Sequence, residues 1–161
     1  MSTHTQVAAT VDKLVALFES VLLPDNEMTV ADGPQVSFPT RKFAVVGGDG
    51  PVDEEEDAAR SMQTWKGLGA NIRDESIDVT CAVGASTGNA DTSMKAVRDE
   101  AVGLLAAIED ALRVEPGRSL GNFTTGGPAA VTETALRYPT NSQGIAATLV
   151  FTINVPVRTG P

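Results

Sequence analysis

The sequence predicts a single α+β domain, with a mostly antiparallel sheet and two helices packed on one face of it. Two segments carry apolar residues at steps of three and four, which is the period of a buried helix face. Several others alternate apolar and polar residues, which is the period of a half-buried strand. These strands follow one another along the chain as hairpins, which favours antiparallel pairing. The predicted order is α-β-β-β-α-β-β, in one domain over residues 1–161.

The first predicted helix covers Thr5 to Leu23. Thr3 or Thr5 can cap its start by accepting hydrogen bonds from exposed backbone N–H groups. Pro24 ends it, because the residue before a proline avoids the helical region. Its apolar face consists of Val7, Val11, Leu14, Val15, Phe18 and Leu22.

The next stretch, Asp25 to Pro39, is a connection whose prolines limit any strand to a few residues. Arg41 to Gly47 is a predicted strand, and Ser61 to Leu68 is another. The latter holds Trp65, the only tryptophan in the chain. We expect it to pair as an antiparallel hairpin with a strand that starts at Asp74.

The stretch Asp74 to Arg113 combines a strand, a small-residue turn at Gly84-Ala85-Ser86-Thr87-Gly88 and a long helix that starts near Met94. Strand, G-x-S-x-G and helix is the layout of a hydrolase nucleophile elbow. The strand's apolar positions are Ile77, Val79, Cys81 and Val83, and those of the helix are Met94, Val97, Ala101, Leu104, Leu105, Ile108 and Leu112.

The elbow lacks its base. A serine hydroxyl is a weak nucleophile until a neighbouring base accepts its proton, and in such hydrolases the histidine follows the serine. The only histidine, His4, precedes the first helix, and Lys95 is expected to lie exposed on the long helix beside Met94. We therefore interpret the motif as a flexible strand-to-helix connection. A small serine hydrolase using Ser86 is the alternative from a different class.

After the second helix, Glu115 to Pro128 is a predicted long loop, and Ala129 to Tyr138 alternates weakly. The clearest strand runs from Ile145 to Val155, with Pro156 expected to end it. Loose ends are expected at about residues 1–4 and 157–161. The final strand points Ile145, Ala147, Leu149, Phe151, Ile153 and Val155 to one side.

Composition narrows the classes of function. Twelve basic residues stand against 21 acidic ones, for a net charge of −9, so a grip on nucleic-acid phosphates is disfavoured. Cys81 is interpreted as a small buried hydrophobe. No Cys and His pair has the spacing of a zinc site, and Gly67-Leu68-Gly69-Ala70-Asn71 lacks the lysine and hydroxyl of a phosphate loop. No cofactor, metal or catalytic residue is predicted. Without a signal layout or a membrane-crossing run, we expect a soluble, intracellular protein.

Five adjacent carboxylates form an acidic run: Asp53, Glu54, Glu55, Glu56 and Asp57. Their spacing does not fit a calcium loop, which places oxygens at alternate positions around a glycine turn. Mutual repulsion favours a solvated loop. We hypothesise that this run faces a partner or a lumen; a loop that only keeps the protein soluble is the alternative.

The layout resembles the tail terminator (tail completion) proteins of siphovirus-type bacteriophages. The resemblance is carried by the first helix, the hairpin around Met62 to Ala70 followed by Glu75 to Cys81, and the long helix up to Arg113. The glycine-rich loop after that helix and the closing strand up to Val155 complete it. It spans most of the chain.

The resemblance implies a structural virion protein without a cofactor or catalytic residue. Such proteins assemble as a ring, expected to be a hexamer, on the end of the tail tube and stop its polymerisation. The other face of the ring docks the head–tail connector, and DNA passes through the lumen without specific binding. The implied place is therefore the head-proximal end of the tail, and no membrane is involved. A tail tube or head-closure subunit is the alternative within the virion.

Overall fold

The computed structural model describes residues 4–35, 37–49, 57–67, 71–88, 93–139 and 144–160, and it confirms the α+β fold class. Two helices accompany a six-stranded, mostly antiparallel sheet. The elements are α1 (Val7–Leu22), β1 (Met28–Asp32), β2 (Lys42–Val46), β3 (Ala59–Trp65), β4 (Arg73–Thr87), α2 (Met94–Arg113), β5 (Ala130–Arg137) and β6 (Ile145–Thr159).

Two long strands form the centre of the sheet. β4 and β6 have 15 residues each and pair antiparallel along their whole length. β2 and β3 share the other edge of β4: β2 lies along residues 81–85 and β3 along residues 73–79. β5 pairs with the outer edge of β6, and β1 pairs with β2 in parallel. The hairpin predicted between β3 and β4 is confirmed.

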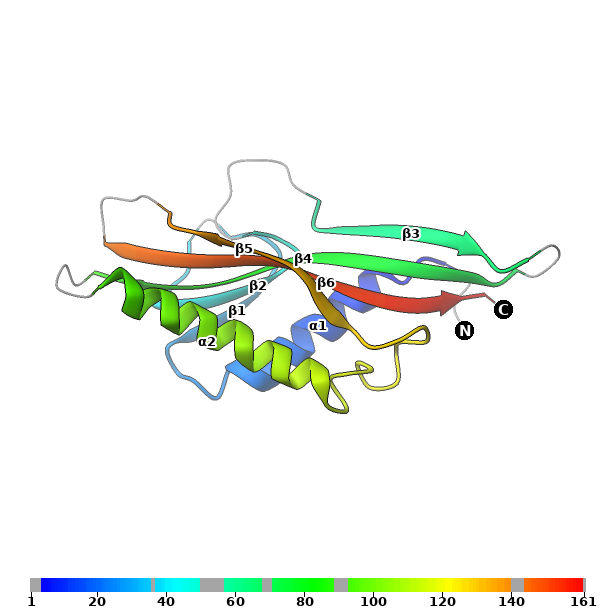
Figure 1. Ribbon diagram of the computed structural model, residues 1–161, viewed down its shortest axis with the longest axis horizontal. Coiled ribbons are helices and arrows are strands. Elements are labelled where there is room, and N and C mark those ends of the chain that lie inside the picture. The colour runs from blue at the N-terminus through cyan, green and yellow to red at the C-terminus, as the bar shows by residue number, and fades with distance from the viewer. Residues whose placement is uncertain are drawn as a thin grey trace.

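Both helices cover the same face of the sheet, as predicted (Figure 1). α2 packs on β4 and β6, while α1 packs mainly on β1 and β2 and touches α2. The rings of Phe18 on α1 and Phe151 on β6 stack with centroids 6.2 Å apart, an arrangement worth about 0.5–1.5 kcal/mol beyond the buried area. The predicted apolar positions of the long helix and of β6 lie in or against this core, apart from Met94.

The start of α1 is capped differently from the expectation for Thr5, and Thr3 lies outside the described residues. Thr5 does not accept from the helix; its hydroxyl donates to the carboxylate of Glu75 on β4. Glu75 also accepts from the backbone N–H of Gln6 at 3.0 Å and from the hydroxyl of Ser61 on β3 at 2.5 Å. The Glu75 carboxylate thus supplies the hydrogen-bond acceptor that a capping side chain would supply. Its negative charge also lies at the positive end of the helix dipole.

Two strands differ from the expectations. The connection after α1 contains the five-residue β1, which fits the limit set by its prolines. Pro156 does not end the last strand, and the expected loose end from residue 157 belongs to β6 as far as Thr159. The carbonyl of Pro156 accepts from Thr125 at 3.0 Å. Its ring nitrogen therefore faces the 125–127 turn and not β4, where a missing N–H would break the ladder.

The small-residue turn predicted at Gly84 is also wrong, because β4 continues through Thr87. Gly84 lies opposite Phe43 of β2, and a Cβ added to it would come within 2.4 Å of the Phe43 ring. Phe43 in turn stacks on Phe38 at 4.2 Å between centroids. The glycine therefore makes room for an aromatic ring on the face away from the helices, and the backbone stays extended.

Candidate functional site

Ser86, the nucleophile of the apparent elbow, lies within a strand ladder. It pairs with Ala146 of β6 on one side. On the other side its N–H donates to the carbonyl of Arg41 at 2.9 Å, and its hydroxyl donates to the same oxygen at 3.3 Å. A nucleophile elbow needs a sharp turn that exposes the hydroxyl. Ser86 has neither this turn nor an imidazole or amine as its hydroxyl partner in the described part of the chain.

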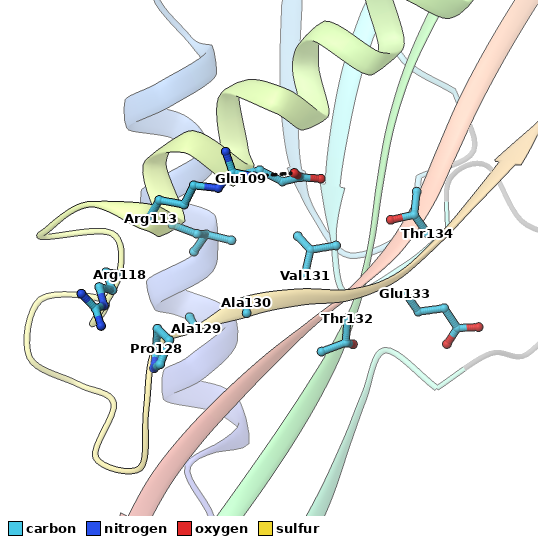
Figure 2. A pocket seen from close by; sticks show the side chains of 11 residues that line it. Glu109, Arg113, Arg118, Pro128, Ala129, Ala130, Val131, Thr132, Glu133 and Thr134 are labelled. Carbon is cyan, nitrogen blue, oxygen red and sulfur yellow. Dashed lines mark ion pairs between the residues drawn. The ribbon is translucent and has the colours of Figure 1, made fainter.

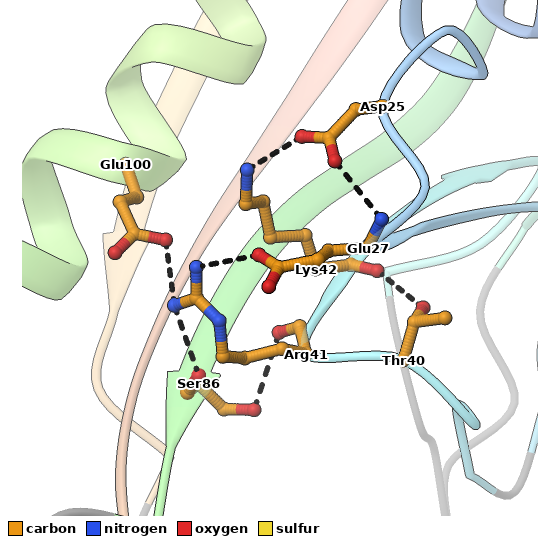
Figure 3. Close-up of polar contacts among 7 residues, drawn as sticks. All are labelled: Asp25, Glu27, Thr40, Arg41, Lys42, Ser86 and Glu100. Carbon is orange, nitrogen blue, oxygen red and sulfur yellow. Dashed lines mark hydrogen bonds and ion pairs between the residues drawn. The ribbon is translucent and has the colours of Figure 1, made fainter.

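Arg41, beside Ser86, is the centre of a polar cluster (Figure 3). Its guanidinium contacts Glu100 of α2 at 2.7 Å and Glu27 at 3.1 Å, and it reaches the carbonyl of Ser86 at 3.5 Å. The hydrogen bond with Glu27 raises the pKa of Arg41, and the one with Glu100 adds to it against partial burial. Next to it, Lys42 pairs with Asp25 at 2.6 Å. These contacts join β2, β4 and α2. The cluster therefore has a structural role, which is to hold these elements together.

The other residues considered for chemistry are Lys95 and Cys81. Lys95 pairs with Asp99 on the exposed face of α2. Cys81 is fully buried, and this burial raises the pKa of its thiol to about 12, as suits the small buried hydrophobe that was predicted. Across the described ranges, no three His, Cys, Asp or Glu side chains come together to hold a metal ion. Within the same residues, neither helix has the length and apolarity that crossing a membrane requires.

The acidic run falls mostly outside the described residues, which exclude Asp53, Glu54, Glu55 and Glu56. Its last member, Asp57, pairs with Arg60 at 2.6 Å and accepts through its backbone carbonyl from Thr80 at 3.2 Å. One end of the run is thus held against the sheet face that the helices leave open.

The part of that open face beside β3 is polar, and several of its side chains pair with one another. Arg158 on β6 contacts Asp74 on β4 at 2.9 Å, and Asn154 donates to Asp78 at 2.8 Å. A shallow hollow of about 490 Å³ crosses the middle of this face. It is lined by Asp57, Arg60, Asp78, Thr80, Thr132, Glu133 and Thr152.

β3 is an edge strand exposed on both faces. Its partner in the described part of the chain is β4 alone, so the backbone groups on its outer side have no strand partner there. Met62 is 74% exposed on the open face, and Trp65 is 62% exposed on the helix side. The guanidinium of Arg73 lies over the Trp65 ring at 5.1 Å, a cation–π contact. Monomeric proteins normally shorten, charge or cover such an edge.

β5 is the edge strand on the opposite side of the sheet, and most of it is exposed as well. A groove of about 550 Å³ lies on its helix side, between β5, the end of α2 and the turns that follow α2 (Figure 2). Val131 lies at the floor of this groove, and Glu109 points from α2 toward β5. The lining comprises Glu109, Leu112, Arg113, Arg118 and residues 128–134.

The candidate functional surface therefore consists of the two exposed edge strands, β3 and β5, and the groove beside β5. The sequence predicted strands at both β3 and β5, but it did not predict that both would be exposed edges of the sheet. A signal was present in β3, whose sequence ARSMQTW has no apolar alternation of its own. Such a strand cannot bury a face, which marks it as an edge.

Comparisons with known proteins give no further lead. No protein-family model matches this chain. No curated protein matches it either.

Proposed function

We propose that this protein is a structural subunit of a phage tail, which closes into a ring on the end of the tail tube, stops tube polymerisation and offers its other side to the head–tail connector. The resemblance described above motivates the identity of the assembly. The observation that carries the proposal is the pair of open, exposed edge strands on opposite sides of one sheet.

Ring closure by rotation requires two different surfaces on each subunit, one to match the other on the neighbour. β3 and β5 meet this requirement. β3, β4, β6 and β5 alternate in direction, because each neighbouring pair is antiparallel. A neighbouring copy in the same orientation would therefore set its β3 antiparallel to β5 and continue the alternation. The outcome is one sheet running through all subunits.

The stagger of the two edges is also close to that of a closed sheet. β3 lies at the level of β6 residues 153–159, and β5 lies at the level of residues 148–154. A contact that keeps the faces of both strands in phase sets Trp65, at the level of Thr159, opposite Val131, at the level of Ile153, which is an offset of six residues. This offset is roughly 20 Å along the strands, across four strands that span roughly 19 Å. A sheet closed with that offset per subunit has strands tilted by about 46°, just above the range of about 35–45° in barrels.

The open face would then line the lumen, with both helices outside. Three arginines of this face form ion pairs with carboxylates: Arg60 with Asp57, Arg137 with Asp49 at 2.8 Å, and Arg158 with Asp74. Phosphate binding depends on basic groups that can release counterions from the nucleic acid. A wall whose arginines are paired with carboxylates supports DNA passage without retention.

Solution mass and electron microscopy of the purified protein test the assembly. We expect single closed rings, or rings that form when tube subunits are added. Long tubes of the protein alone would instead favour the tail tube alternative. The decisive experiment is phage assembly without this chain, in which we expect overlong tubes that do not join heads. Virions with joined tails of normal length would refute the proposed function.

The acidic run stays a separate prediction within this proposal. Replacing Asp53, Glu54, Glu55, Glu56 and Asp57 by their amides should impair tail completion or DNA passage if the run contacts the lumen or the next ring. Tails of normal length that deliver DNA would leave the run with a role in solubility only. The measurement is tail length in micrographs, together with the infectivity of the particles.

A further inference from the structure

We infer that the ring contact consists of β3 of one copy added to the β5 edge of the next, with Trp65 of the first copy seated in the groove between β5 and α2 of the second. The inference rests on the proposed function, because it names the surface by which that ring closes. The occupant of the groove is thus a second copy of this chain.

Trp65 projects to the correct side of the sheet. In the β3–β4 ladder Trp65 lies opposite Arg73, and Ser61, four residues before it in β3, bonds to Glu75 on the helix side. Alternate residues of a strand share a face, so Trp65 projects toward the helix side as well. Trp65 is 62% exposed as a residue. A tryptophan can bury roughly 150–250 Å², so most of its apolar surface is left for a partner.

The groove lies on the same side of the sheet. Val131 and Thr134 of β5 pair with Ile153 and Phe151, both of which are core residues on the helix side of β6. Both β5 residues line the groove. A strand added to β5 in the plane of the sheet would therefore direct its helix-side residues along the mouth of this groove.

The registers of the two strands match when Trp65 is set opposite Val131, one pair away from full overlap. Both side chains then lie on the helix side of the sheet. The irregularity between Val131 and Glu133 inserts one extra residue in β5, so that Gln63 then meets Thr134 on the same face. A bulge of this kind keeps the alternation in phase on both sides of it. The two strands have seven and eight residues, so neither leaves a long unpaired remainder.

The charges permit this contact. Trp65 carries the guanidinium of Arg73 on its ring, and the groove contributes the carboxylate of Glu109, whose described partner is Arg113 at 3.5 Å. On the open face the same register brings Arg60 close to Arg137. Both arginines already have a carboxylate partner, Asp57 and Asp49 respectively, so the repulsion between them is reduced.

β1 is the competing donor edge, since it too has one strand partner in the described chain. Its Met28 and Ala31 are buried, whereas six of the seven residues of β3 are exposed. β1 is also packed against α1. Pairing through β1 would leave Trp65 in water, and this difference makes the two edges distinguishable by experiment.

The single tryptophan gives a direct readout on the wild-type protein. As concentration rises, we expect the Trp65 emission to shift to shorter wavelength and acrylamide quenching to fall, in step with association measured by sedimentation. Trp65→Ala and Thr134→Arg should each weaken association by about tenfold or more, as expected of a buried aromatic anchor. Val102→Arg is the control, because Val102 is 47% exposed on α2 and outside the groove.

A disulfide test fixes the strands involved. Combining Gln63→Cys with Thr134→Cys should give disulfide-linked ladders of the chain under mild oxidation, whereas each single substitution should not give ladders. The two positions lie on opposite edges of the sheet, about 14 Å or more apart across three strand spacings, so they cannot bridge within one chain. Cys81 is buried and stays out of the reaction.

The outcomes separate this inference from the proposed function. Rings that form with unchanged Trp65 emission, without ladders and with normal association of Trp65→Ala would overturn the β3–β5 contact and leave the ring standing. A wild-type chain that stays monomeric at millimolar concentration, together with a Gln63→Cys/Thr134→Cys chain that forms no ladders when tube subunits are added, would overturn it too. Ladders and a Trp65 shift together with normal tails in particles lacking the chain would confirm the contact and refute the proposed function.

Discussion

The two halves of β4, residues 75–79 and residues 81–85, differ in how deeply they are buried. Residues 81–85 are buried on both faces. α2 covers one face, and on the other face Phe43 and Val45 of β2 lie beside Gly84 and Ala82. In residues 75–79 the buried and exposed positions alternate, and the neighbouring β3 is exposed throughout most of its length. Residues 81–85 therefore hold the fold together, whereas residues 75–79 and β3 present a surface. We expect substitutions near residues 81–85 to lower stability and substitutions in β3 to weaken partner binding.

The strongest test of this contrast truncates one aromatic side chain in each region. Phe151 is 1% exposed, lies opposite Cys81 and stacks on Phe18. We expect Phe151→Ala to lower the free energy of unfolding by about 3–5 kcal/mol. Trp65→Ala should change it by about 0.5 kcal/mol or less in dilute monomer. Urea unfolding measures both, and equal losses would contradict the division of the strand.

A second test uses a pair of glycines. In Gly84→Ala the new methyl group would meet the Phe43 ring, which is held by Phe38, so we expect a loss of about 1–3 kcal/mol from overpacking. Gly103→Ala is the matched control, since a Cβ there meets nothing within 4 Å. Within α2 this change should stabilise the protein by about 0.5–1 kcal/mol. Thermal unfolding should therefore shift in opposite directions, and shifts of the same sign would argue against the close packing at Gly84.

Glu75 is a buried charged residue in the half of β4 that pairs with β3, and it is only 1% exposed. Burial raises the pKa of Glu75, but hydrogen bonds from Ser61, Thr5 and the Gln6 N–H outweigh it, so the pKa lies below its ordinary value. A lowered pKa in the folded state means that Glu75 adds stability above the ordinary glutamate pKa of 4.5, which is lost as the pH falls through the folded value.

We accordingly expect Glu75→Ala to cost about 1–3 kcal/mol at neutral pH, since three donors lose their acceptor. Glu75→Gln should remove that acid-linked part of the pH dependence of unfolding while costing less. Asp78→Asn is the control, because Asp78 lies on the same strand but faces the open side. Unfolding curves at several pH values between 3 and 7 provide the measurement. A Glu75→Gln variant that loses stability on acidification as wild type does would exclude Glu75 as the titrating group.

The smallest difference between two variants should come from the ion pairs of Arg41 and Lys95. Arg41 bridges Glu27 and Glu100 with its side chain 35% exposed, so Arg41→Met should cost about 1 kcal/mol, reduced further by salt. Lys95→Met, which removes an exposed helix pair, should cost about 0.5 kcal/mol or less. Equilibrium unfolding at low and high salt compares them. A loss above about 3 kcal/mol at Arg41 would indicate a buried network.

Much of the architecture followed from local patterns. Helical periodicity placed both helices to within a few residues, and alternation placed β4 and β6 with their inward faces, because burial on one side imposes those periods. The open edges could not be predicted in this way. Whether Trp65 is covered depends on which strand lies beside β3, and a seven-residue sequence does not encode its neighbour.

The sequence by itself determined the order of elements, the inward positions of each and the lack of a histidine after Ser86. These are local or compositional properties, and no partner segment is needed to read them. Tertiary structure decided that Gly84 to Thr87 stays extended, because Phe43 fills the space over Gly84 and the carbonyl of Arg41 takes the N–H of Ser86. It likewise decided which edges stay open, because pairing is made between segments far apart in the chain.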